Sequence, residues 1–412
     1  MSQIRPFKGY RPNPELAERI AAPPYDVLNV KEGKALAGDN PLSFLHVEKP
    51  EIDFPGEVDT HSELVNKKAV ENFQKLIKTG ALIRDSSPCF YIYQQTMGTH
   101  TQCGIMLGAS VAEYEQGIIK KHEFTRKDKE DERAYHVDTI NANTGPVMLT
   151  YRADRNIDKL VDKIRDSKKP EYDFTADDGI KHVMWVVSKP EDVSAIQKSF
   201  LTVPAMYIAD GHHRSAAAFR VKETRQAKNS KPSGEEPYHF FLGVAFPDNQ
   251  LKIMGYYRVV KDLNNLSPAE LLQKIAQKYD VSETHNPEPR QMHCFSMYLD
   301  GRWYNLSAQK GTFPADDPIE SLDVAILQKN LLEPILNLFD IRTNKRIDFV
   351  GGIRGTQELE KRCKEDCRVA FALYPTSVPQ LMKVADANEV MPPKSTWFEP
   401  KLRSGMVVRS LE

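Results

Sequence analysis

Apolar residues follow two different periods along the chain. Several segments repeat apolar positions every three to four residues, which predicts amphipathic helices; they are 62–82, 156–167, 191–200, 214–228 and 267–279. Other segments are short apolar runs bounded by turn residues, which predicts strands; they are 89–97, 104–114, 146–151, 181–188, 203–210, 240–246 and 253–260. The mixture of both element types predicts an α+β, mixed α/β fold.

The chain is expected to divide into two lobes near residue 232. The stretch 227–237 is rich in Lys, Ser, Gly and Pro, a composition typical of a connection. We therefore predict an N-terminal lobe over 1–232 and a C-terminal α+β lobe over 233–412, which includes a hairpin that turns at Asp300-Gly301. Proline and turn residues in 1–60 predict a segment that wraps over the surface and forms no regular layer.

Composition excludes several classes of partner. The 412 residues contain 56 Lys and Arg and 57 Asp and Glu, a formal charge of -1, so no overall basic field attracts nucleic acid or an anionic membrane. We expect no apolar run long enough for a membrane span and no signal-like start, which favours a cytoplasmic protein. Five cysteines agree with a reducing compartment.

Polar side chains gather where the predicted strand 203–210 passes into the helix 214–228. The sequence there is Asp210-Gly211-His212-His213-Arg214. Because the first amides of a helix are unpaired and its N-terminal end is positive, anions bind at such a point. Gly211 lets the backbone approach a phosphate, and His213 and Arg214 add donors. The segment therefore predicts a phosphate-binding loop.

Three other uses of the same residues stay open. The adjacent histidines are also suited to binding a metal, Asp210 to capping the helix, and Arg214 to starting a helix at the surface. A buried-looking strand next to so dense a polar cluster favours the functional interpretation.

A second polar cluster precedes the first by many residues. It contains His122, Glu123, Thr125, Arg126 and Arg133 within a run of mixed charge. The His-Glu-x-x-His zinc pattern is not met, because Arg126 stands in the place of the second histidine. A carboxylate between hydroxyl and cationic groups suits a base that acts on a hydroxyl near phosphate, although mixed charge runs are also typical of solvated helix faces.

The two clusters together resemble the motifs of a known group of enzymes. His122-Glu123-x-Thr125 followed by Asp210-Gly211-x-His213-Arg214 is similar to the paired motifs of free-serine kinases, small enzymes of the ParB/sulfiredoxin-like superfamily. The whole chain resembles a larger uncharacterised-domain family related to them. The segments 22–26 (Ala-Pro-Pro-Tyr-Asp) and 400–405 (Pro-Lys-x-x-Ser-Gly) carry that second resemblance together with the loop.

The resemblance implies a kinase that transfers phosphate from ATP or ADP to the hydroxyl of free L-serine. It implies that Glu123 is the base and that residues 210–214 hold the nucleotide phosphates, with Mg²⁺ bound largely by phosphate oxygens. Asp210 is expected to bind the metal or to assist at the hydroxyl. Arg126 or Arg133 is expected to hold the serine carboxylate, with His122 and Thr125 nearby. The spacing departs from the small kinases, because 87 positions separate Glu123 from Asp210.

The chief alternative is a nucleotide-binding regulatory or DNA-associated protein of the ParB type. That class requires a basic helix-turn-helix after the loop, where this sequence predicts strands and hairpins. A sulfiredoxin-like enzyme requires a cysteine in the loop, where this chain has His212. We also predict that Tyr25, Asp26, Lys401 and Ser404 approach the same cleft, because irregular Pro-rich segments with polar residues often line sites. The oligomeric state is not indicated by the sequence.

Overall fold

The computed structural model describes residues 2–60 and 62–412, which form two compact units. The first unit contains Met1–Lys121, Thr125–Leu251 and Pro400–Glu412, and the second contains His122–Phe124 and Lys252–Glu399. Within the described residues, no helix combines the length and the apolar composition that a bilayer span requires.

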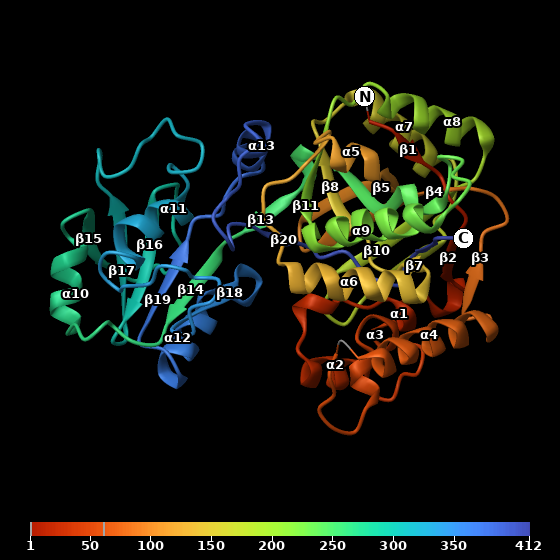
Figure 1. Cartoon of the computed structure of the whole chain (residues 1–412). Helices are drawn as coiled ribbons and strands as arrows, with labels where there is room; N and C mark the ends of the chain where they lie inside the picture. Colours follow the sequence, from red (N-terminus) through yellow and green to blue (C-terminus); the bar gives the residue numbers. More distant parts are fainter. Residues whose placement is uncertain (1, 61) are drawn as a thin grey trace. The chain divides into compact units, whose positions relative to one another are not determined.

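The first unit is built on a nine-stranded mixed sheet (Figure 1). Its order is β6-β11-β8-β12-β5-β4-β10-β9, and β1 also pairs with β5. The strands are β1 (Ile4–Arg5), β4 (Phe90–Met97), β5 (His100–Ser110), β6 (Ile119–Lys120), β8 (Val147–Tyr151), β9 (Tyr172–Thr175), β10 (Lys181–Val187), β11 (Met206–Asp210) and β12 (Phe240–Pro247). The central strands β8 and β12 are buried along their whole length, which explains their continuous apolar runs.

Helices connect these strands, and those that have an apolar face bury it on the sheet. They are α5 (Val111–Glu115), α6 (Lys127–Ile140), α7 (Arg155–Asp166), α8 (Pro190–Phe200) and α9 (His212–Lys228). In α7, the buried residues Ile157, Val161 and Ile164 recur at helical spacing and join the core of the sheet. The predicted mixed α/β fold class is confirmed, and the expected helices at 156–167, 191–200 and 214–228 are present.

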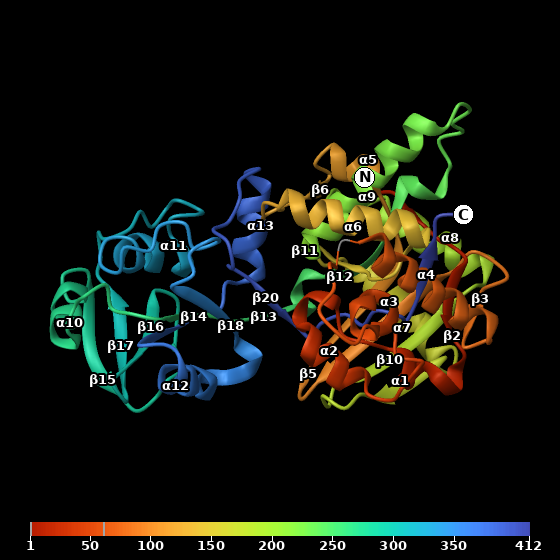
Figure 2. The same cartoon turned by 60° about the horizontal axis from the view of Figure 1, so that its bottom comes forward.

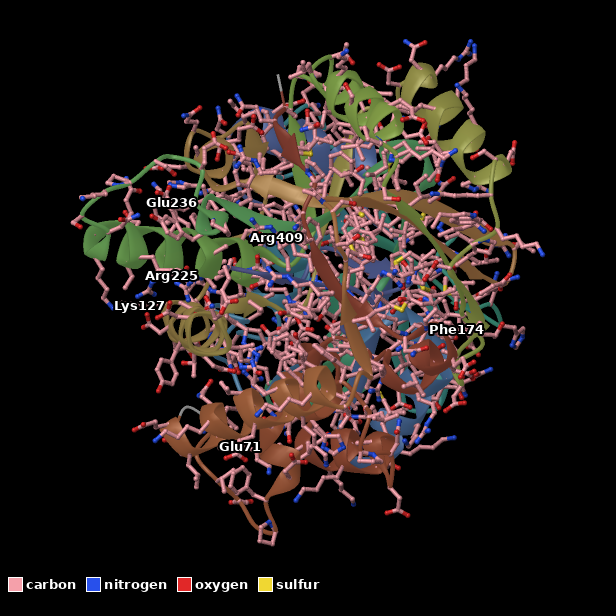
Figure 3. The ribbon with its side chains drawn as sticks, turned by 90° about the vertical axis from the view of Figure 1, so that its right-hand side faces the viewer. Glu71, Lys127, Phe174, Arg225, Glu236 and Arg409 are labelled. Atoms are coloured by element: carbon pink, nitrogen blue, oxygen red, sulfur yellow. The ribbon has the colours of Figure 1, made fainter. Side chains whose placement is uncertain are left out.

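The helix α6 was not expected, because its sequence has almost no apolar periodicity. It lies beside α9 in the chain's first unit (Figures 1 and 3). Its acidic side chains pair across to α9, where Arg225 Nε donates to Asp138 Oδ1 at 2.7 Å and Arg220 contacts Asp131. Charge pairs between α6 and α9 therefore take the place of apolar contacts along much of α6. Because identification of a helix from sequence depends on a periodic apolar face, α6 gave no such signal.

Residues 1–60 do more than wrap over the surface. Figure 2 brings their short helices forward, together with α4. The elements are η1 (Pro14–Leu16), α1 (Ala17–Ile20), η2 (Tyr25–Val27), α2 (Val30–Ala37), α3 (Leu45–Glu48), η3 (Pro50–Asp53) and α4 (Glu63–Lys78). They accompany a four-stranded sheet of order β3-β2-β21-β7, formed by β2 (Gly9–Pro12), β3 (Leu82–Arg84), β7 (Ala142–Asn143) and β21 (Val408–Ser410). Ile20, Phe44, Leu45 and Val47 are completely buried there, so this region has a core of its own and the expected irregular wrap is wrong.

His46 joins α3 to the following segments and gives the region a pH-dependent contact. Its Nδ1 lies 2.5 Å from Asp53 Oδ1, and its Nε2 lies 3.1 Å from the carbonyl of Asn40. Both ring nitrogens face acceptors, which favours the doubly protonated ring. The hydrogen bond to Asp53 raises the pKa of His46 above its usual range, although burial opposes this shift.

We expect His46→Gln to destabilise the protein by roughly 1–2 kcal/mol at pH 6 and by less at pH 9. The folded pKa is raised, so the stabilisation is fully present below the unfolded pKa of about 6.5 and is lost as pH rises through the folded pKa. Thermal unfolding of both proteins across this range measures the difference. An equal difference in Tm at both pH values would show that the charge of His46 makes no contribution.

The second unit contains a six-stranded antiparallel sheet of order β15-β17-β16-β19-β14-β18. Its strands are β14 (Tyr256–Val260), β15 (Tyr279–Thr284), β16 (Cys294–Leu299), β17 (Arg302–Ala308), β18 (Ile347–Gly351) and β19 (Val369–Leu373), and β13 (Lys252–Met254) pairs with β20 (Trp397–Glu399). The helical elements are α10 (Pro268–Ile275), α11 (Asp323–Leu327), the π-helical η6 (Gln328–Leu332), α12 (Gly355–Glu365) and α13 (Val378–Asp386). Asp300 and Gly301 have φ of 47° and 81°, so the predicted hairpin turn is confirmed.

The boundaries between the two units do not lie near residue 232, where the sequence predicted them. The strand β12 pairs with β5 and β8, and this pairing carries the first unit on to Leu251. The final segment Pro400–Glu412 belongs to the first unit, where β21 pairs with β2. The polar stretch near 232 is therefore a surface loop between α9 and β12 inside the first unit.

Candidate functional site: a strand-to-helix loop and its arginine pocket

The loop after β11 joins a buried strand directly to the start of a helix. Ile208 and Ala209 are buried in the sheet, and α9 begins at His212, directly after Gly211. Gly211 has φ of 98°, in the left-handed region that other residues rarely adopt, and its carbonyl accepts from the backbone N–H groups of Arg214 and Ser215. The first backbone N–H groups of α9 consequently point out of the helix end. The expected turn at 210–214 is confirmed.

We expect Gly211→Ala to destabilise the protein by roughly 1–2 kcal/mol, because a Cβ is disfavoured at this φ. The added Cβ would not clash with its surroundings, because it would lie 3.4 Å from Val147 Cα, an ordinary van der Waals distance. The cost should therefore arise from the backbone, and a shift of the helix end should also weaken anion binding. Denaturant unfolding measures the first effect and phosphate titration the second; unchanged stability would show that the loop tolerates other conformations.

Asp210 is held at the edge of the loop by two contacts. Its Oδ1 accepts from the backbone N–H of Gly211 at 2.9 Å, and its Oδ2 accepts from Lys401 Nζ at 2.8 Å. Burial alone would raise the pKa of Asp210, but the Lys401 ammonium outweighs burial and lowers that pKa below its usual range. Asp210 is therefore ionised at neutral pH and can serve as an oxygen ligand or an acceptor.

The C-terminal segment that supplies Lys401 also holds the segment around Tyr25. Ala22 and Ser404 exchange two backbone hydrogen bonds, with N···O distances of 3.1 and 2.8 Å. The Tyr25 ring lies under the guanidinium of Arg214, 5.3 Å from its Cζ. Tyr25 and Lys401 therefore contact residues of the loop, as predicted. The Asp26 side chain is exposed, but its charge acts on Arg214, and Ser404 is placed by its bonds to Ala22.

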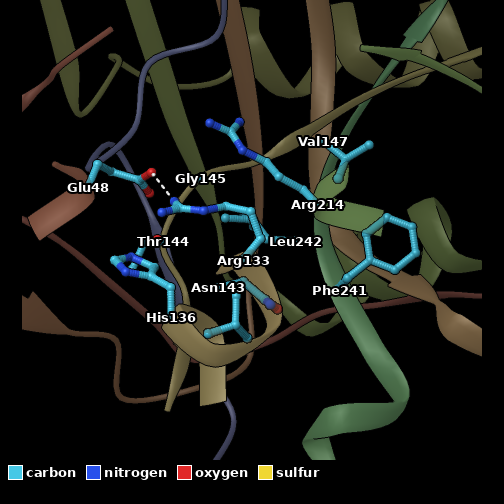
Figure 4. A pocket seen from close by; sticks show the side chains of 11 residues that line it. Glu48, Arg133, His136, Asn143, Thr144, Gly145, Val147, Arg214, Phe241 and Leu242 are labelled. Carbon is cyan, nitrogen blue, oxygen red and sulfur yellow. Dashed lines mark ion pairs between the residues drawn. The ribbon is translucent and has the colours of Figure 1, made fainter. Parts of the chain in front are cut away.

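A small pocket lies beside the loop, lined by Arg214 and by side chains of α3 and α6 (Figure 4). Arg214 Nη1 donates to the carbonyl of Pro146 at 2.8 Å, and its guanidinium rests on Gly145, where a Cβ would come within 2.8 Å of Cζ. Arg133 approaches from α6, and its Cζ lies 4.0 Å from the centre of the Tyr25 ring. Two guanidinium groups thus stack on one tyrosine and face the same pocket.

Glu48 and His136 also line the pocket, together with the polar residues Asn143 and Thr144. Glu48 is 2% exposed and forms an ion pair with Arg133 (Figure 4), with 3.6 Å between Oε2 and Nη1. Burial lowers the pKa of His136 well below its usual range, and the charges of Arg133 and Arg214 lower it further. His136 is therefore neutral at physiological pH. The pocket has two fixed cations and one buried anion.

The second sequence cluster is divided between the two units. Thr125 Oγ1 donates to Glu130, and the backbone N–H of Arg126 donates to His213 Nε2 at 3.1 Å, so the start of α6 is joined to the loop. The Arg126 side chain is exposed and paired with Asp128. His122 and Glu123 belong to the second unit, where the carbonyl of His122 accepts from Met391 N–H. The position of Glu123 at the loop stays a prediction.

Two ionisable residues of the pocket, Glu48 and His136, were not among the expected site residues. Glu48 comes from the region that was expected to be irregular, and no local pattern marks it. His136 follows Arg133 by three positions on α6, and both are buried. That spacing places them on one helix face, and recognition of α6 as a helix would have predicted the pair.

The fold and the loop together define a mixed α/β protein in which strand β11 passes through Gly211 into the N-terminus of α9. The chain belongs to the family described as a protein of unknown function, DUF1015, whose model matches residues 4–325. No curated protein matches the chain.

Several solved structures are distantly similar to the chain. A free serine kinase in complex with AMP is 13% identical, with a TM-score of 0.35 over 72% of this chain and 86% of that one. SbnI with a C-terminal truncation, from Staphylococcus aureus, is 11% identical, with a TM-score of 0.38 over 74% and 87%. A conserved hypothetical protein from Pyrococcus furiosus is 13% identical, with a TM-score of 0.35 over 75% and 95%.

Proposed function

We propose that this protein is a nucleotide-dependent kinase that phosphorylates the hydroxyl of free L-serine to give O-phosphoserine. One observation carries the proposal: the loop Asp210–Arg214 presents a helix N-terminus, and Arg214 shares a pocket with Arg133. The likeness of the loop and of His122-Glu123-x-Thr125 to the motifs of free-serine kinases supports the choice of reaction. Membership of the ParB/sulfiredoxin-like superfamily is part of the same proposal.

The loop binds the phosphates of the nucleotide. The first N–H groups of α9 donate to phosphate oxygens, and Gly211 lets the chain approach closely. His213 Nε2 accepts a hydrogen bond from the backbone N–H of Arg126. A neutral His213 ring therefore carries its proton on Nδ1, and that atom can act as a donor. Arg214 neutralises charge that develops as the phosphoryl group moves.

Asp210 is suited to help hold Mg²⁺. Its carboxylate is ionised, and each oxygen retains a lone pair beyond its bonds to Gly211 and Lys401. Magnesium is commonly held by one or two carboxylates together with substrate phosphates and water, and one carboxylate at a phosphate loop fits that pattern. The bound ion supplies charge neutralisation on the phosphate oxygens.

Glu123 acts as the base in this proposal. The serine hydroxyl oxygen attacks the terminal phosphorus, the bond from that phosphorus to the bridging oxygen breaks, and the hydroxyl proton passes to the Glu123 carboxylate. Three peptide units separate Glu123 from Arg126, which limits their Cα atoms to about 11 Å. Arg126 N–H donates to His213 Nε2, so this short connection is compatible with the proposed role of Glu123.

A ParB-type regulatory or DNA-associated role has less support. The helix α9 is followed by β12 of the central sheet, where that class would have a basic helix-turn-helix. The formal charge of -1 also gives no overall attraction to a nucleic-acid backbone.

The proposal is tested by incubating the purified full chain with Mg²⁺, ATP or ADP, and each of a panel of free amino acids. Phosphorus NMR and mass spectrometry should detect O-phosphoserine and the corresponding nucleotide product. Homoserine and threonine serve as hydroxyl controls, and alanine as the control without a hydroxyl. Nucleotide binding without phosphorylation of any amino acid would reject the kinase and favour the regulatory alternative.

A further inference from the structure

The pocket beside the loop contains buried polar atoms of both charge types that the protein does not pair. Within residues 2–60 and 62–412, no hydrogen-bond partner lies within reach of Arg133 Nε, Arg214 Nη2, Glu48 Oε1 or His136 Nε2. Arg133, Glu48 and His136 are each at least nine-tenths buried. Buried polar groups are ordinarily paired, so unpaired donors and an unpaired carboxylate oxygen in one pocket point to a bound group.

The charges of the pocket decide what kind of group fits. A simple oxyanion would pair with the two arginines but would offer no donor to Glu48 Oε1, which would stay buried and unpaired. A simple cation would pair with Glu48 but would meet two guanidinium groups. A group that carries a carboxylate and an ammonium on adjacent atoms satisfies both sets of atoms, because each end finds a partner of opposite charge.

We propose that this pocket binds the head group of an α-amino acid, with Arg133 and Arg214 on the carboxylate and Glu48 on the ammonium group. The inference rests on the proposed function and deepens it, because it assigns the residues that select a free amino acid as the acceptor. Arg133 was expected at the carboxylate from the sequence, whereas Glu48 is a new assignment.

The geometry of the lining agrees with this assignment. Glu48 Oε2 is 3.6 Å from Arg133 Nη1, an ion-pair distance that is too long for a hydrogen bond, so the pair leaves Oε1 available. The Tyr25 ring fixes both guanidinium groups by stacking. The pocket is small, with a volume of about 20 Å³, so it admits only the compact end of a ligand and excludes a nucleotide base.

The test compares three ligands on the full chain by calorimetric titration without nucleotide. L-serine carries the complete head group, 3-hydroxypropionate lacks the ammonium, and ethanolamine lacks the carboxylate. We expect the protein to bind each analogue more weakly than serine by roughly 10²-fold or more, because a buried partner is left unpaired. Binding of either analogue as tightly as serine would overturn the proposal, and this comparison requires no variant.

Glu48→Gln assigns the ammonium contact. The preference for serine over 3-hydroxypropionate should fall below about tenfold, while the preference over ethanolamine is kept. Glu132→Gln is the matched control, because Glu132 also contacts Arg133, at 3.4 Å, without lining the pocket. A Glu48→Gln protein that keeps the original preference would overturn the assignment. A second result would also overturn the assignment: inorganic phosphate competes with serine, and it binds the Glu48→Gln protein more tightly than the wild-type protein. That result would indicate a site for a simple oxyanion.

The titrations separate this inference from the kinase proposal. Wild-type protein that discriminates the analogues as expected, but forms no O-phosphoserine with nucleotide, supports the head-group pocket and rejects the kinase. Formation of O-phosphoserine with an unchanged ligand preference in Glu48→Gln supports the kinase and rejects the pocket assignment. Absence of serine binding by the folded wild-type protein rejects the pocket and serine as the acceptor.

Discussion

Glu123→Gln is expected to lower the turnover of L-serine by roughly 10²–10⁴ and to leave nucleotide affinity unchanged. The amide keeps the shape and hydrogen-bonding capacity of the side chain but cannot take the hydroxyl proton. Its role is confined to the chemical step, so kcat should fall while the Kd for ADP stays within about twofold. Steady-state kinetics and nucleotide titration on the same preparation measure both quantities.

The matched control for this variant is Asp128→Asn, which removes a carboxylate five positions later. Asp128 is exposed and pairs with Arg126, so its loss should change kcat little. Near-normal turnover in Glu123→Gln would show that Glu123 is not the base. Asp210, which is ionised and lies at the loop, would then be the first candidate to replace it.

Segments with a strong local pattern could be predicted from the sequence, and those held by distant partners could not. The helix α7 and the hairpin at Asp300-Gly301 have periodicity or turn residues of their own, and both are present. The helix α6 lacks an apolar stripe because its charges pair with α9, so its sequence resembled a solvated run. In residues 1–60, burial of Phe44 and Leu45 depends on α4 and on the C-terminal strand β21, neither of which local patterns can reveal.

The same distinction separates the two halves of the candidate site. The loop at Asp210–Arg214 is local, because a buried strand, a glycine and a helix start follow one another directly, and its geometry was predicted correctly. The pocket is assembled from α3, α6 and α9, which lie far apart in the sequence. Glu48 could therefore not be identified before the fold was known, while Arg133 was identified only through resemblance.

Lys401 shows how the end of the chain contributes to the loop. Its ammonium pairs with Asp210, and the same segment is anchored where Arg403 contacts Asp178 and donates to His182 Nε2 at 3.3 Å. This anchoring places a cation at the loop without a local sequence signal. The short motif at 400–405 therefore has a physical reason to accompany the loop motif: each supplies one half of an ion pair.

Arg214→Ala is expected to weaken nucleotide binding by roughly 10–10²-fold and to lower kcat/KM for serine by roughly 10³–10⁴. The guanidinium carries charge that serves both the phosphates and the acceptor pocket, so its loss should affect affinity and the chemical step together. The variant should also lose stability, because the buried side chain donates to the Pro146 carbonyl and lies over the Tyr25 ring, but the turn and the helix do not depend on it. Thermal unfolding checks that the variant is intact.

Two further variants identify the reason for that loss. Arg214→Lys keeps the charge but removes the planar fork, so it should recover less than about one tenth of the lost kcat/KM, and added Mg²⁺ should recover little because a point charge cannot replace two parallel donors. Arg225→Ala is the matched control on the same helix, since Arg225 pairs with Asp138 and Asn141 away from the loop, and it should retain normal kinetics. If Arg214→Ala bound nucleotide as tightly as the wild-type protein, the guanidinium would have no contact with phosphate, and its role would be confined to the amino-acid pocket that it shares with Arg133 and Glu48.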